Sequence, residues 1–130
     1  MSLWRHQAFE QFPELRTELQ ETKTVMGFWI ELGFAFNDAY RMGNIDLFKR
    51  ILDYADWSII NTPRGKEVGD DPPSCIHVAF FEHMPPASRE DTFDRIALGR
   101  ELLTWGGPSI SHPYVKALLQ NLIERQAAKA

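Results

Sequence analysis

The hydrophobic pattern is clearest between residues 25 and 61, where apolar residues recur at helical spacing in two consecutive segments. In the first segment they fall on two stripes instead of one. One stripe is Met26, Trp29, Ile30, Gly33, Phe36 and Tyr40, and the other is Val25, Phe28, Leu32, Ala35 and Ala39. A helix that is apolar on two sides must be covered on two sides. The pattern therefore predicts a central helix with other helices packed on both faces.

The second segment, residues 44–61, predicts a partner helix for the first. Gly43 supplies a helix stop, and Asn44 supplies the N-cap of a new helix. The apolar stripe of this helix is Ile45, Phe48, Leu52, Ala55 and Ile59, with charged residues opposite. The two segments together predict a central antiparallel helical hairpin.

Further helical segments are expected around this hairpin. They lie at residues 3–21, 74–84, 88–104 and from 113 onward. Pro13 divides the first segment into a short turn and a helix, and Ser88 with Asp91 resembles a capping box. Residues 61–73 form the one long loop, dense in Pro, Gly, Asn and Asp.

No segment of useful length alternates between apolar and polar residues, as a half-buried strand would. We therefore expect one all-α domain over residues 1–130, with five or six helices. A short stack of helical hairpins in the style of HEAT repeats fits the same pattern, although no second copy appears at a fixed period.

Composition bounds the classes of function. The chain has 130 residues with a net charge of −4, 44% hydrophobic and 25% charged residues, as in an ordinary globular protein. The charge argues against a nucleic-acid partner, which would require a clustered basic face. The single Cys75 excludes an internal disulfide, and its expected place is the core. No stretch of about 18 apolar residues occurs, so we expect no membrane span and a cytoplasmic location.

Four short motifs follow one another along the chain. They are FPEL at residues 12–15, GFAF at 33–36, IHVAFFEHM at 76–84 and GGP at 106–108. This order resembles a family of small bacterial all-helical proteins of unknown function. Some relatives in that family are similar to toxin-neutralising immunity proteins, so the resemblance implies a protein partner.

Aromatic and acidic residues gather around the end of the second predicted helix and the following loop. They are Tyr54, Asp56, Trp57, Glu67, Asp70 and Asp71. Exposed aromatic residues beside acids are typical of interface hot spots. These residues predict a surface for a basic partner protein. The alternative for Trp57 is that it packs beneath the loop and belongs to the core.

A second group of polar residues could line a cleft between helices. Glu31 and Asp38 are seven positions apart on one face of the central helix, and His77 and Glu82 lie in the 74–84 segment. Carboxylates on an otherwise apolar helix can have perturbed pKa values and a function. The competing interpretation is that Glu31 and Asp38 mark a narrow solvent-facing edge.

The histidines do not predict a metal site. Ligands on one helix should be three or four positions apart, whereas His83 is six and Glu82 is five positions beyond His77. His83 falls on the apolar stripe of its segment, which favours a core histidine. We therefore expect neither a metal nor a cofactor.

The sequence thus favours a non-enzymatic protein-binding module, in the form of a bacterial toxin-neutralising immunity protein if the resemblance holds. A homodimer is compatible with this hypothesis. The alternative is a small enzyme or ligand-binding protein that uses Glu31, Asp38, His77 and Glu82 in an interhelical cleft. An apolar pocket with these groups directed into it would favour the alternative.

Overall fold

The computed structural model describes residues 2–87 and 94–129, and this part of the chain is all-helical, without a strand. Its seven α-helices are α1 (Leu3–Gln11), α2 (Arg16–Gln20), α3 (Val25–Met42), α4 (Ile45–Asn61), α5 (Pro72–Cys75), α6 (Arg95–Leu103) and α7 (Pro113–Lys129). Its shorter turns are η1 (Pro13–Leu15), η2 (Val68–Asp70), η3 (Ile76–Phe80), η4 (Phe81–His83) and η5 (Ser109–Ser111). The all-α prediction is confirmed, and the helices outnumber the expected five or six because short turns divide the predicted segments.

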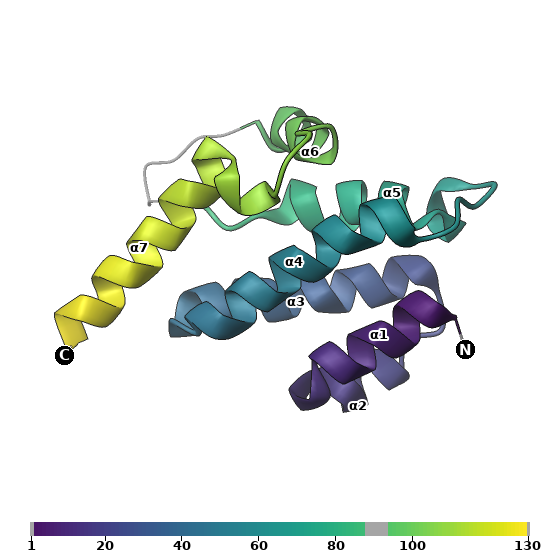
Figure 1. Cartoon of the computed structure of the whole chain (residues 1–130), viewed down its shortest axis with the longest axis horizontal. Coiled ribbons are helices and arrows are strands. Elements are labelled where there is room, and N and C mark those ends of the chain that lie inside the picture. Colours follow the sequence, from purple (N-terminus) through teal and green to yellow (C-terminus); the bar gives the residue numbers. More distant parts are fainter. Residues whose placement is uncertain (1, 88–93, 130) are drawn as a thin grey trace.

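Helices α3 and α4 lie along each other through the middle of the molecule (Figure 1). Helix α1 contacts α4 and α2 contacts α3 on one side, while α5, η3 and η4 cover the other side and carry α6. Helix α7 leads to the C-terminus and packs on this body: Val115, Leu118 and Leu122 are buried, and the Arg125 side chain donates hydrogen bonds to backbone carbonyls at the end of α3. Both sides of α3 are therefore covered, as its two apolar stripes predict.

Local capping chemistry fixes the ends of α3 and the start of α4. The side chain of Thr24 accepts a hydrogen bond from the backbone N–H of Gly27, and that of Asn44 accepts one from Leu47. Between the two helices, Gly43 has a φ of 77°, a left-handed conformation that disfavours any residue with a Cβ. The Gly43 stop and the Asn44 cap are found where the sequence placed them.

Buried side chains from all seven α-helices join one hydrophobic cluster. The largest members include Trp29, Phe36, Phe48 and Tyr54, each at most 1% exposed. Of the two predicted stripes on α3, only Ile30 is largely open, at 39% exposure.

The structure corrects the predicted start of two helices. Residues 3–11 form a regular helix instead of a short turn before Pro13. Helix α5 begins at Pro72, not at Ser74, because Asp71 caps it and proline suits the first helical position. The predicted capping box of Ser88 and Asp91 lies outside the described residues, and α6 begins after the cap residue Asp94.

Among the described residues, no helix combines the length and the apolar character that crossing a bilayer would need.

Candidate functional site

Tyr54 belongs to the core, so its predicted place on a binding surface is wrong. Its side chain is 0% exposed, and its hydroxyl donates a hydrogen bond to the backbone carbonyl of Trp4. Its ring stacks on Trp29 with the centroids 5.6 Å apart. More of the α4 surface is buried than the predicted stripe, because α1 and α5 contact this helix in addition to α3.

Trp57 and Asp56 are held by neighbouring parts of the fold. Trp57 is half-buried, and its ring stacks on Tyr54 with the centroids 6.0 Å apart. The carboxylate of Asp56 accepts a hydrogen bond of 3.0 Å from the backbone N–H of Ser109. Burial raises the pKa of Asp56. Trp57 therefore packs partly against the core, through Tyr54, as one half of the alternative predicted.

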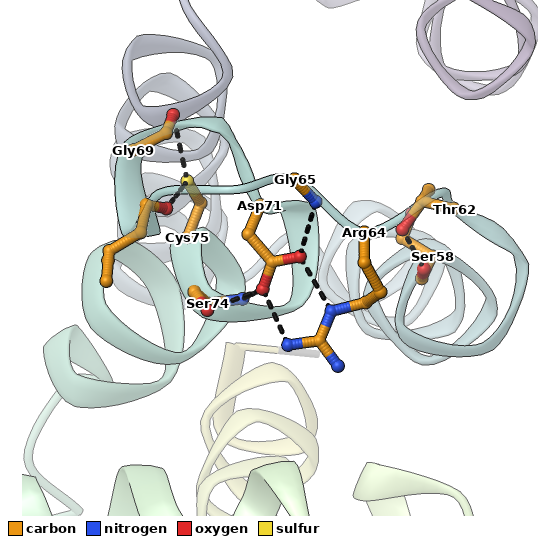
Figure 2. Close-up of polar contacts among 9 residues, drawn as sticks. Ser58, Thr62, Arg64, Gly65, Gly69, Asp71, Ser74 and Cys75 are labelled. Carbon is orange, nitrogen blue, oxygen red and sulfur yellow. Dashed lines mark hydrogen bonds and ion pairs between the residues drawn. The ribbon is translucent and has the colours of Figure 1, made fainter.

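Asp71 organises the loop after α4 and does not present its charge to solvent (Figure 2). Its side chain is 4% exposed, and it is bound by the guanidinium of Arg64 at 2.6 and 2.8 Å. It also accepts hydrogen bonds from the backbone N–H groups of Gly65 and Ser74 and from the Ser74 hydroxyl. Asp71 was predicted as a surface residue, and this was wrong. The sequence Asp-Pro-Pro, a cap before a helix start, was the available signal.

Of the six residues predicted for this surface, only Glu67 and Asp70 are exposed. They lie on the loop that Asp71 holds, which folds back so tightly that a Cβ on Gly65 would lie 2.4 Å from the carbonyl oxygen of Asp70. The six predicted residues therefore do not form one continuous aromatic and acidic surface.

Cys75 lies beside this loop and is chemically inert. Its side chain is 0% exposed, and its thiol donates to the carbonyl oxygens of Val68 and Gly69 at 3.2 and 3.5 Å (Figure 2). Burial raises the pKa of the Cys75 thiol to about 11, so it is protonated at neutral pH. The predicted core role is confirmed.

Glu31 and Asp38, from the alternative set, line one hollow of about 410 Å³. We call this hollow the acidic groove; it lies between α2 and α3 and reaches the first turn of α4. Its apolar walls include Leu15, Leu19, Ala35 and Leu47, and its carboxylates are Glu18, Glu31 and Asp38. Among the described residues, no lysine, arginine or histidine lines it. Glu31 and Asp38 thus share one face of α3, as their spacing predicts, and Asp38 is at the same time open to solvent.

Phe34 and Met42 border the acidic groove and are open to solvent. Phe34 is 62% exposed and Met42 is 71% exposed. Phe34 also borders a second hollow of about 430 Å³ on its other side, together with Ile30, Ala79 and Met84. A large aromatic ring thus stands between two hollows. Phe34 was not predicted as a site residue, although a phenylalanine three positions after Glu31 and four before Asp38 was a visible signal.

His77 and Glu82 meet elsewhere, and neither lines the acidic groove. Their Nε2 and Oε2 atoms are 4.0 Å apart. The expectation that a spacing of five separates them was wrong because η3 is a π-turn, in which residues five apart lie one above the other. His77 Nε2 is buried without a hydrogen-bond partner among the described residues.

Helix α6 approaches this pair through Gly99. A Cβ at position 99 would lie 2.6 Å from Glu82 Cγ and 2.9 Å from His77 Cδ2. We expect Gly99→Ala to lower the free energy of unfolding by about 1–2 kcal/mol, because overpacking outweighs the better helix propensity of alanine. Urea denaturation followed by circular dichroism measures this. Gly69→Ala is the matched control, since a Cβ there meets nothing within 4 Å. Equal stability of the two variants would contradict the close packing.

The remaining histidines differ in their surroundings. His83 is exposed, so its predicted core position is wrong. His112 is buried, with Nε2 3.0 Å from Glu101 and Nδ1 accepting a hydrogen bond from the backbone N–H of Tyr114. In the described part of the chain, no three His, Cys, Asp or Glu side chains gather closely enough to hold a metal ion.

Comparisons with protein-family models, with curated proteins and with solved structures find no match to this chain. The candidate function therefore depends on the geometry of the chain's own residues.

Proposed function

We propose that this chain is a non-enzymatic protein-binding module whose contact surface is the exposed side of α3. The observation that carries the proposal is the position of Phe34, 62% exposed between two hollows. An aromatic ring that is open in the free protein and becomes buried in a complex is a common hot spot. Ile30 and Met42 extend the same apolar surface along the helix.

The charge of this surface favours a basic partner. Glu18, Glu31 and Asp38 border the acidic groove, and Asp38 is paired with Arg41 at 2.8 Å. Complementary charge speeds encounter and selects the partner more than it raises final affinity. The binding surface is therefore moved from the predicted 54–71 region to α3, while the predicted character of the partner is kept.

A more specific form of the proposal is a toxin-neutralising immunity protein of a bacterium. Its support is the order of the four motifs at residues 12–15, 33–36, 76–84 and 106–108. In this form α3 and α4 act as the central antiparallel hairpin of one domain, and the reducing cytoplasm suits the single Cys75.

One observation favours the alternative class, a small enzyme: Glu31 and Asp38 share the acidic groove, whose walls are apolar. The ion pair of Asp38 with Arg41 already engages one of these two carboxylates, which favours binding over acid–base catalysis.

The test is capture of partners from native cell extract by the wild type, Phe34→Ala and Ile60→Ala. Ile60 is 81% exposed at the end of α4 and serves as the matched control. We expect Phe34→Ala alone to lose the partner. With the purified partner, its Kd should rise about 30-fold, the effect of a hot spot of about 2 kcal/mol. Equal capture by all three proteins would place the binding surface elsewhere.

A further inference from the structure

Two helices form the sides of the acidic groove. Leu15 and Leu19 line it from η1 and α2, and Ala35 and Ala39 line it from α3. Its volume of about 410 Å³ is at the lower end of the range for small-ligand pockets, which suits a few large side chains. Seating the apolar face of a helix in such a groove is a recurring mode of protein recognition.

Two of the three groove carboxylates lie on α3. Glu31 and Asp38 are two helical turns apart, about 10.5 Å along the axis, and Phe34 stands between them. Glu18 adds a third carboxylate from α2. Glu18 and Glu31 have no ion-pair partner among the described residues, so their charges are available to a partner. Asp38 is paired with Arg41 at 2.8 Å on the exposed surface, so a base of the partner would share its carboxylate with Arg41.

We propose that an amphipathic helix of a partner protein occupies the acidic groove. Its basic residues lie at positions i and i+7, and a large apolar residue lies between them at i+3 or i+4. A helix packed nearly along α3 has the same rise per residue, so bases seven positions apart reach both Glu31 and Asp38. The residue between them enters the groove beside Phe34. This inference rests on the proposed function.

The charge also argues against a second copy of this chain as the occupant. Two copies placed groove to groove would bring carboxylates against carboxylates, which costs affinity instead of adding to it. A partner that supplies lysine or arginine removes this repulsion.

The probe is a pair of helical synthetic peptides of about 15 residues, a length at which isolated helices begin to form. One carries lysines seven positions apart with two leucines midway. The other has the same composition with lysines five positions apart, which puts them on different faces. Binding is followed by ¹⁵N NMR titration of the whole chain, since shifts at Phe34, Leu19 and Met42 report on the groove.

We expect the seven-spaced peptide to bind about fivefold more tightly than the five-spaced peptide, because two partly exposed ion pairs contribute modestly. This preference should disappear in Glu31→Gln/Asp38→Asn and should shrink as salt rises. Glu67→Gln/Asp70→Asn is the matched control, because it changes the net charge equally at two exposed acids outside the groove. The control should keep the preference.

Two outcomes would overturn this inference while leaving the proposed function in place. The first is equal binding of both peptides, or no binding, while Phe34→Ala still loses the native partner. The second is a dimer in sedimentation that Phe34→Ala dissociates, which would make a second copy the occupant. Retention of the native partner by Phe34→Ala would instead refute the proposed function itself.

Discussion

Replacing Trp29 with alanine is expected to lower the free energy of unfolding by roughly 3–5 kcal/mol, the usual loss for a large aromatic residue in a core. Trp29 is 0% exposed on α3. Its ring stacks on Tyr54 and meets the edges of Phe28 and Phe80 at centroid distances of 5.6 and 6.0 Å. Since whole domains are stable by only about 5–15 kcal/mol, this one change removes a large part of the total.

Trp29→Phe distinguishes the contribution of the aromatic ring to stability from that of the indole N–H. Nε1 of Trp29 is buried and has no acceptor among the described residues, and such a buried donor costs about 1–3 kcal/mol. Phenylalanine keeps an aromatic ring and removes that donor, so we expect less than half of the alanine loss. Chemical denaturation of the three proteins measures both effects. A loss below about 1 kcal/mol for alanine would mean that α3 is not central to the core.

The parts of the fold that the sequence predicted depend on local chemistry. Gly43 and Asn44 act through hydrogen bonds and backbone angles within a few residues of themselves. The breaks at Pro13 and at residues 105–108 have the same local origin. Such signals are readable without knowledge of the tertiary structure.

Burial on α4 could not be predicted in the same way. Ile51 and Tyr54 are 0% exposed although they lie outside the predicted stripe. Their burial depends on segments far away in the sequence that contact α4, such as α1, whose Trp4 carbonyl accepts the hydrogen bond from Tyr54. The spacing of His77 and Glu82 was misjudged for a related reason, because periodicity assumes an α-helical register and η3 is a π-turn.

The candidate site was predicted in part. Helical spacing alone put Glu31 and Asp38 on one face, and they do share the acidic groove. The hollow itself depends on where α2 returns after Pro13 and on the first turn of α4, which no local pattern reveals. Phe34 was overlooked because it lies on neither of the two predicted apolar stripes of this helix.

The stability of the chain in acid should depend strongly on Asp71. Arg64 is the largest cause of the lowered pKa of Asp71, followed after desolvation by the Ser74 side chain and two backbone N–H groups. A carboxyl group whose pKa is lower in the folded state stabilises the fold fully above its unfolded pKa of about 3.9. That contribution is lost as the pH falls toward the folded pKa. The buried Asp56, with its raised pKa, acts in the opposite direction.

We expect Asp71→Ala to lower the free energy of unfolding at pH 7 by about 2–4 kcal/mol. The change removes the cap of α5 and leaves donors from Gly65 and Ser74 without their acceptor. Asp71→Asn should lose less, since asparagine can also cap a helix. It should also flatten the fall in stability below about pH 4, because the titrating group is gone. Urea denaturation between neutral and acid pH measures both effects.

Comparing Arg64→Ala with Asp71→Ala tests whether the ion pair or the backbone hydrogen bonds of Asp71 contribute more to stability. The ion pair is the largest cause of the lowered pKa, yet the Arg64 side chain is 72% exposed, so water screens its attraction. We therefore expect a much smaller loss from Arg64→Ala than from Asp71→Ala, because the backbone donors of Gly65 and Ser74 keep their acceptor (Figure 2). Equal losses would show that the ion pair, and not the capped backbone, holds the loop between α4 and α5.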